Sequence, residues 1–328
     1  MTAAANPVEV RDLDMAFRMG RAGGRPAMQQ VLHGLSFDIG PGETLGLVGE
    51  SGSGKSTAGR ILVGLHEPTG GSVRLFGQSI TGPERARGLA AVRARLQFVF
   101  QDPHAALNPR LRVGDSIAEP IDIAGDRSRR ERNERVRELL EMVGLPRDSD
   151  ERFPHEFSGG QRQRIVIARA LALQPGFVVC DEPVSALDVS MQAQIVNLLM
   201  DLQARFGLSY LFIAHDLAVV RAIAHRVAVL YAGSIVEIAA RDDLYRRPQH
   251  PYTQALLEAV PRPDPARRRG PVLGGEVPSL MAPPSGCRFH TRCPKATPRC
   301  SAEAPRLRAT EPGRLTACHL YDPERTAP

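Results

Sequence analysis

Residues 49–57 read GESGSGKST and fit the pattern G-x-x-x-x-G-K-[ST]. The apolar run LGLVG (45–49) predicts a buried strand before this loop, and a helical pattern begins at about Lys55. Glycines let the chain curl so that successive N–H groups face phosphate oxygens, and the N-terminus of the following helix adds positive potential. The stretch predicts an ATP phosphate site made of Gly49, Glu50, Ser51, Gly52, Ser53, Gly54, Lys55, Ser56 and Thr57.

A metal-side carboxylate is predicted further along the chain. FVVCDEP (177–183) ends an apolar strand with Asp181 and Glu182. Asp181 can hold Mg²⁺ together with the Ser56 hydroxyl, and Glu182 can polarise an attacking water. An acidic pair could also simply end a strand, but buried carboxylates are costly unless they are used.

Strands and helices alternate along the chain. Apolar runs predict strands at 177–181 and 209–214, a helix between them that ends near Gly207, and a hairpin turning at 232–234. This alternation favours an α/β fold with a mostly parallel sheet covered by helices. Residues from about 104 to 174 are mostly helical in pattern and are interpreted as an insertion into that core, whereas 243–328 is rich in Pro and Gly and predicts a small, loop-rich extension.

Composition narrows the class of protein. The 328 residues carry a net charge of +6, with 42% hydrophobic and 24% charged residues, which is ordinary for a soluble globular chain. Charges of both signs are interspersed, so we expect no nucleic-acid partner. The N-terminus lacks the pattern of a signal peptide, and no apolar run is long enough to span a bilayer. Work at a membrane would therefore need partner subunits.

Four of the five cysteines gather near the C-terminus with the spacing C-x5-C-x6-C-x17-C, at Cys287, Cys293, Cys300 and Cys318. Disulfides are not expected in a reducing cytosol. A loop-rich segment has little core, so a metal centre would order it, and four thiolates suit Zn²⁺ or an iron–sulfur cluster. The absence of a C-x2-C pair argues against a zinc ribbon, and free structural thiols remain an alternative. Cys180 is interpreted as a core residue.

The order of motifs resembles the ATPase subunit of an ABC transporter over roughly residues 8–240. These motifs are the P-loop, FQDP (100–103), FSGGQRQR (157–164), CDEP (180–183), SALD (185–188) and AHD (214–216). The resemblance implies a P-loop NTPase (RecA-like) core with an inserted helical subdomain. It implies an ATPase domain over 1–242, with the helical subdomain at about 104–174 and the extension at 243–328.

The resemblance also implies roles for single residues. Glu182, His215 and Gln101 are the implied catalytic residues: Gln101 touches Mg²⁺ and the attacking water, and His215 contacts the γ-phosphate. Phe17 matches the position where a ring stacks on adenine. The ATP-binding signature and the subunit contact match Ser158, Gly159, Gly160, Gln161 and Asp188, and the implied Mg²⁺ ligands are Ser56, Gln101 and Asp181.

The signature SGGQ opens a helix, so its hydroxyl and amides form a second anion-binding end. In the family, the signature of one subunit closes over the P-loop of another, and ATP is sandwiched between two chains. One cassette is present here, which implies a second ATPase subunit, identical or different.

The C-terminal region resembles the extension of peptide/nickel importer ATPases. The matching pieces are HPYTQALLEAVP (250–261), GEVPSL (275–280), GCRFHTRCP (286–294) and ACHL (317–320), and NPRLRVGDSIAEP (108–120) resembles that group's stretch facing the membrane subunits. The resemblance implies an ATPase at the cytoplasmic face of the membrane that powers import of oligo- or dipeptides through two permease subunits, fed by an extracytoplasmic binding protein. It also implies a [4Fe–4S] cluster on the four cysteines, with Zn²⁺ as the alternative.

Three other interpretations stay open. One is that this ATPase drives import of nickel, opines or sugars, as similar ATPases do in close relatives of the peptide importers. A soluble ABC ATPase associated with nucleic acid is a rival, although such proteins normally carry two cassettes or a coiled-coil insertion. A third hypothesis is a regulator that senses redox state through the cysteine-rich segment.

Overall fold

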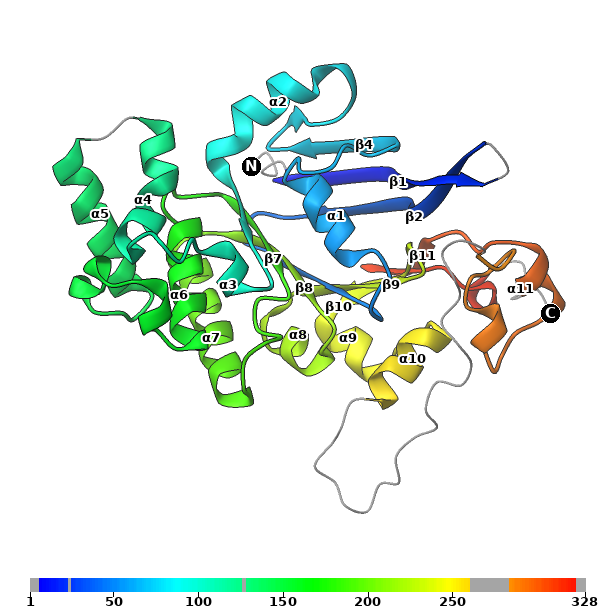
Figure 1. The fold of residues 1–328 in the computed structure, drawn as a ribbon. Helices are drawn as coiled ribbons and strands as arrows, with labels where there is room; N and C mark the ends of the chain where they lie inside the picture. Colours follow the sequence, from blue (N-terminus) through cyan, green and yellow to red (C-terminus); the bar gives the residue numbers. More distant parts are fainter. Residues whose placement is uncertain (1–5, 23–24, 126–127, 260–282, 323–328) are drawn as a thin grey trace, which may run out of the picture.

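The computed structural model describes residues 6–22, 25–125, 128–259 and 283–322. Two β-sheets form its framework (Figure 1). The larger sheet has eight strands in the order β11-β12-β10-β9-β3-β8-β7-β6. Its strands are β3 (Thr44–Val48), β6 (Leu96–Val99), β7 (Phe177–Asp181), β8 (Ser209–Ala214), β9 (Arg226–Tyr231), β10 (Ser234–Ala240), β11 (Arg308–Glu311) and β12 (Arg314–Thr316).

The central strands of the larger sheet are parallel and buried on both faces. Side chains alternate along β7, because Phe177 and Val179 belong to one apolar cluster while Val178 and Cys180 belong to the other. This alternation follows from the two-residue repeat of a strand. Cys180 is fully buried, which confirms its interpretation as a core residue.

A second, antiparallel sheet lies above one face of the first, with the strand order β2-β1-β4-β5. Its strands are β1 (Val8–Ala22), β2 (Arg25–Ile39), β4 (Gly70–Leu75) and β5 (Gln78–Ser79). Helix α1 (Lys55–Leu62) lies between the two sheets (Figure 1) and buries Ala58, Ile61 and Leu62 in their shared core. The stretch predicted to bind phosphate thus lies between a buried strand, β3, and a helix that is packed between two sheets.

Helices cover the opposite face and form a lobe at one end. The lobe holds the predicted helical insertion; α1 and α2 (Arg85–Val92) precede it along the chain, and the remaining helices follow it. The helices are α2 (Arg85–Val92), α3 (Pro103–Ala106), α4 (Val113–Ala124), α5 (Arg129–Met142), α6 (Gly159–Ala170), α7 (Val189–Phe206), α8 (Leu217–Ile223), α9 (Arg241–Arg246), α10 (Pro251–Glu258) and α11 (Pro298–Ala302). The core-facing side chains of α5 include Val136, Leu139 and Leu140, which are all buried.

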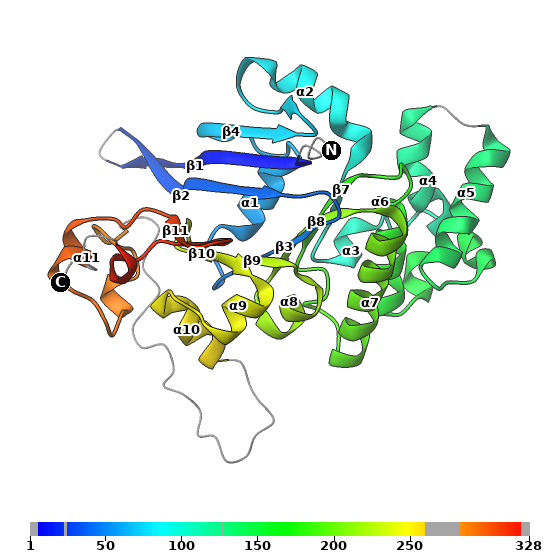
Figure 2. The same cartoon turned by 180° about the vertical axis from the view of Figure 1, so that it is seen from behind.

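The C-terminal extension is loop-rich, as predicted, but two of its strands belong to the main sheet. Strands β11 and β12 form a hairpin, and β12 pairs with β10 of the cassette (Figure 2). The predicted boundary at Asp242 falls inside α9 and stays a prediction. GEVPSL (275–280) lies outside the described residues.

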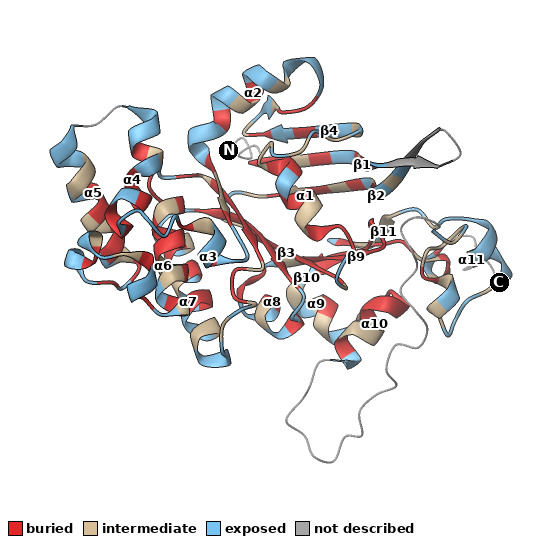
Figure 3. Cartoon of the chain, viewed as in Figure 1, coloured by how far each residue is buried: buried red, intermediate tan, exposed pale blue. Residues whose placement is uncertain are grey.

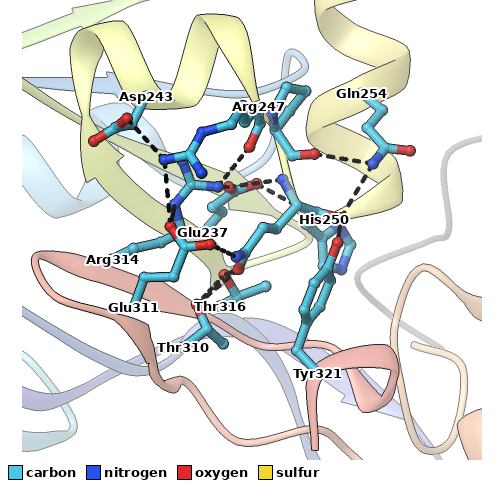
Figure 4. Close-up of polar contacts among 12 residues, drawn as sticks. Glu237, Asp243, Arg247, His250, Gln254, Thr310, Glu311, Arg314, Thr316 and Tyr321 are labelled. Carbon is cyan, nitrogen blue, oxygen red and sulfur yellow. Dashed lines mark hydrogen bonds and ion pairs between the residues drawn. The ribbon is translucent and has the colours of Figure 1, made fainter.

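A buried polar network fixes the extension to β10 (Figure 4). The carboxylate of Glu237, on β10, accepts hydrogen bonds from the backbone N–H groups of Gln249 (3.0 Å) and His250 (2.9 Å). The guanidinium of Arg314, on β12, lies 3.6 Å from the same carboxylate, and both side chains are buried. A buried carboxylate needs such partners, so this network orients α10 and the hairpin together.

Burial is concentrated in the two sheets and in the helix faces that pack on them (Figure 3). In the described part of the chain, no helix combines the length and apolar character needed to cross a membrane.

Candidate functional site

The stretch GESGSGKST forms the connection between β3 and α1, as the sequence predicts. Gly54 has φ 103°, and Gly49 lies so close to the backbone of Leu230 that a Cβ atom there would collide with its carbonyl oxygen. Both positions therefore require glycine. The Lys55 ammonium is buried and donates to the carbonyl oxygens of Gly49 (2.8 Å) and Glu50 (2.9 Å). Burial lowers the pKa of Lys55, and the Glu182, Asp181 and Glu50 carboxylates oppose that fall.

A cleft of about 630 Å³ opens over this loop. It is large enough for a nucleotide-sized ligand. It is lined by Val31, Ser51, Gly52, Ser53, Gly54, Lys55, Ser56, Thr57, Gln101, Glu182 and His215. The structure thus brings most of the predicted phosphate-binding residues and all three predicted catalytic residues to one cavity.

The predicted Mg²⁺ ligands meet at the edge of this cleft. The Ser56 hydroxyl donates to Oδ1 of Asp181 at 2.8 Å, and Gln101 lines the same cavity. Burial raises the pKa of Asp181, and the hydrogen bond from Ser56 offsets part of the rise. Hydroxyl, amide and carboxylate oxygens are the donors that Mg²⁺ prefers, so this set of residues fits the ion.

Glu182 lies at the centre of a polar cluster. Its Oε2 accepts from Nε2 of Gln101 (3.1 Å) and lies 3.2 Å from Nδ1 of His215. Its backbone has φ 47°, an uncommon value for a non-glycine residue that occurs more often at functional sites. The strand end therefore presents a carboxylate held by an amide and an imidazole, beside the phosphate loop.

The signature forms a separate helix N-terminus. Ser158 caps α6: its hydroxyl accepts from the N–H of Gln161 (3.4 Å), and the Gln161 side chain accepts from the N–H of Ser158 (3.0 Å). Asp188 caps α7 in a similar way by accepting from the N–H of Met191 at 2.9 Å. The N-termini of α6 and α7 lie near each other, because both caps line one cavity.

A second cavity of about 240 Å³ lies beside these two caps. It is lined by Ser158, Gly160, Gln161, Arg164, Asp188, Ser190, Met191, Gln194 and Ile195. It shares no lining residue with the cleft over the P-loop in the part of the chain that the structure describes. Within one chain, the signature and the P-loop line two separate cavities.

Three residues predicted on the P-loop side of the ATP site do not line the cleft. Phe17, on β1, is half-buried and packs edge-on against the ring of His66, with 5.4 Å between the ring centroids. Gly49 and Glu50 belong to the loop but are absent from the cleft lining. Instead, the Glu50 carboxylate contacts Arg292 of the extension, and its backbone N–H donates to the hydroxyl of Tyr252 (3.0 Å). Sequence reasoning missed both contacts, although Tyr252 belongs to one of the motifs that carry the resemblance.

The four C-terminal cysteines lie in one small lobe, and each is half-buried. Burial raises the pKa of Cys318 to about 11, and the other three thiols add to that rise, so the four groups are near one another. Both ring nitrogens of His319 are already engaged, by Asp322 and by the carbonyl of Glu303. Across the described ranges, no group of three or more His, Cys, Asp or Glu side chains is arranged to hold a metal ion. As placed, the thiols do not form a ligand set.

Similarity to known proteins shows the family to which the chain belongs. Residues 32–185 match the ABC transporter family, and residues 236–300 match the C-terminal region of oligopeptide/dipeptide transporters. A peptide import ATP-binding protein of Brucella abortus is 62% identical over 314 residues, which cover 95% of this chain and 92% of that protein. A similarly named protein of Brucella ovis is 55% identical over 295 residues, or 90% and 93% of the two chains.

Solved structures agree with this class. An ATP-binding cassette, solved as a dimer in a post-hydrolysis state with ADP and phosphate, is 30% identical; the match covers 71% of this chain and 98% of that one, with a TM-score of 0.63. A subunit of an ABC transporter complex from Clostridium perfringens has the same fold at 23% identity, with coverage of 74% and 91% and a TM-score of 0.63. The chain belongs to the ABC transporter family of ATP-binding proteins.

Proposed function

We propose that this chain is the ATP-hydrolysing subunit of an importer for oligo- or dipeptides, working at the cytoplasmic face of the membrane with two permease subunits. The match of residues 236–300 to the oligopeptide/dipeptide transporter region carries the proposal, because the cassette itself is common to many ABC proteins. The names of the Brucella relatives support the same substrate class.

We propose the following roles in the cleft. Glu182 is the general base, because its carboxylate ends a strand beside the phosphate loop and is within hydrogen-bond reach of two polar partners. Gln101 and His215 orient that carboxylate and contact the water and the γ-phosphate. Lys55 and the loop amides bind the phosphates. Ser56, Asp181 and Gln101 hold Mg²⁺, which supplies charge neutralisation at the phosphates when bound.

The second half of each site comes from a facing ATPase subunit. The signature cavity holds a helix N-terminus and a hydroxyl but, among its described lining residues, only Asp188 as a carboxylate, and that side chain is engaged in its own cap. We propose that Ser158, Gly159, Gly160 and Gln161 bind the γ-phosphate of ATP held on the partner's P-loop, with Asp188 at the contact. The dimeric cassette of the solved relative supports this arrangement.

We also propose that Cys287, Cys293, Cys300 and Cys318 hold a [4Fe–4S] cluster, with Zn²⁺ as the alternative. Their number, their nearness and the small size of the lobe support a metal, although the side chains as placed do not converge on one point. Protein purified without oxygen tests the choice. A brown sample with stoichiometric iron and sulfide supports the cluster, and a colourless sample with one zinc per chain overturns it.

The transport proposal is tested in vesicles that contain the permease subunits and both ATPase subunits, with the binding protein added outside. Short peptides are expected to raise ATP hydrolysis and to accumulate inside, and Lys55→Ala should abolish both effects. Stimulation by nickel or a sugar instead of peptides would overturn the substrate class. Salt-sensitive binding of DNA or RNA without permease partners would favour the soluble rival.

A further inference from the structure

Glu50, the second residue of the P-loop, is held by the C-terminal extension. Nη1 of Arg292 donates to Oε2 of Glu50 at 2.8 Å, and Nη2 donates to Oε1 at 3.0 Å. The Arg292 side chain is only 4% exposed and that of Glu50 is 23% exposed. A two-point guanidinium–carboxylate contact with this little exposure to solvent is strong and directional.

The same segment holds the backbone of the loop. The hydroxyl of Tyr252, on α10, accepts from the N–H of Glu50 at 3.0 Å. Tyr231, Tyr252 and Phe289 pack their rings together, with centroids 4.5, 5.2 and 5.4 Å apart. Arg292 lies beside this cluster and contacts the Tyr231 hydroxyl at 3.4 Å. The first turn of the P-loop is thus fixed on its carboxylate and on its N–H by residues outside the cassette motifs.

The negative charge of Glu50 links its contact with Arg292 to the binding of ATP. The Glu50 carboxylate is a negative charge at the edge of a loop that receives a triphosphate, and it already acts on the pKa of Lys55. Arg292 neutralises that charge. Without Arg292, the Glu50 carboxylate would be left without this counter-charge beside the loop and would repel the incoming phosphates.

We propose that Arg292 is a positioning residue of the ATP site, through which the cysteine-bearing extension sets the affinity of the P-loop for nucleotide. Arg292 ends the 3₁₀ turn η5 (His290–Arg292), five residues after Cys287 and directly before Cys293, so a movement of either cysteine would shift Arg292 through the short segment that joins them. This inference rests on the proposed nucleotide site and adds to it a link between the lobe and the P-loop.

The test is the equilibrium dissociation constant of the magnesium complex of a non-hydrolysable ATP analogue. Arg292→Met is expected to weaken binding about tenfold, within the usual range of coupling between sites. Adding Glu50→Gln to Arg292→Met should recover most of that loss, because the repelling charge is gone. In steady-state assays, Arg292→Met should raise KM for ATP far more than it lowers kcat.

Arg308→Met is the matched control. Arg308 also lies in the extension and pairs with a buried carboxylate, Asp322, at 3.2 Å, so its ion pair belongs to the lobe itself and not to the P-loop. It should leave nucleotide affinity unchanged. Equal losses in Arg292→Met and Arg308→Met, or no recovery on adding Glu50→Gln, would overturn the inference, because a loss of lobe stability would then explain the effect. Failure of the unaltered protein to bind the analogue would overturn the proposed function instead.

Discussion

The cleft over the P-loop and the pocket beside the signature helix differ in the chemistry they hold. The cleft combines a buried ammonium, a strand-end carboxylate and the oxygens for a metal ion. The pocket offers two capped helix N-termini, and its described lining includes no histidine or lysine. The cleft therefore holds the groups proposed to bind ATP and to activate water, whereas the pocket holds only groups that can stabilise negative charge. The difference supports the proposal that the cleft and the pocket are complementary halves of a shared site.

The largest effect is expected when Glu182, the proposed general base of the cleft, is replaced. Glu182→Gln keeps the hydrogen-bonding shape but cannot accept a proton, so phosphate release should fall on the order of a thousandfold. ATP should still bind, because the substitution leaves the phosphate loop intact. Turnover equal to that of the unaltered protein would contradict the role assigned to Glu182.

The next effect concerns the pocket. Ser158→Ala removes the cap of α6 and the hydroxyl proposed to meet the partner's γ-phosphate, so ATPase activity should fall about 100-fold. Ser128→Ala is the control, because Ser128 closes the same kind of capping box on α5 and is not among the described residues that line the pocket. Both variants should lose about 1 kcal/mol of unfolding free energy. Equal ATPase activity in the Ser158→Ala and Ser128→Ala variants would contradict a role of the pocket in ATP hydrolysis.

A pH effect sharpens the comparison, because the extension contacts Glu50 of the P-loop that lines the cleft. Burial lowers the pKa of His250 to about 3, whereas the unfolded value is near 6.5. The neutral ring therefore contributes stability above pH 6.5, and that stability is lost as the pH falls toward 3. Between pH 7 and pH 5, His250→Asn should lose about 2 kcal/mol less than the unaltered protein in urea unfolding. Asn is chosen because it can still cap α10. Parallel losses in the two proteins would contradict a buried neutral ring.

The smallest expected effect distinguishes Asp181, the carboxylate beside the cleft, from Asp188, the carboxylate beside the signature pocket. Burial raises the pKa of Asp181, so the folded chain loses stability as the pH rises through that value. Without nucleotide and Mg²⁺, Asp181→Asn should raise the Tm at pH 7 by about 2 °C, and the gain should shrink as the pH falls. Asp188→Asn, at the exposed cap of α7, should give no such gain. A gain that does not depend on pH would contradict the effect of a buried charge.

The local chemistry of the cassette was largely predictable from sequence. The P-loop, the strand ending at Asp181 and the helix opened by Ser158 follow from short-range patterns, because turns, two-residue alternation and caps are local. The structure then brings Gln101, Glu182 and His215 to one cleft, which motif order alone could only imply.

Contacts of long sequence separation were not predictable. The pairing of β12 with β10 and the bond between Arg292 and Glu50 join segments far apart in the chain. The extension has weak periodicity, so its hairpin gave no clear strand pattern, and an arginine in a cysteine-rich segment gives no sign of its partner. The positions of Phe17 beside His66 and of Glu50 outside the cleft are likewise set by tertiary packing.

The divided site is tested most directly by the ATPase rate per chain, measured as the purified protein is diluted. If two chains complete each site, the rate per chain should rise with protein concentration, fall toward zero on dilution, and level off only where light scattering detects dimers in the presence of ATP. A rate per chain that stays constant down to concentrations where only monomers exist would contradict the account.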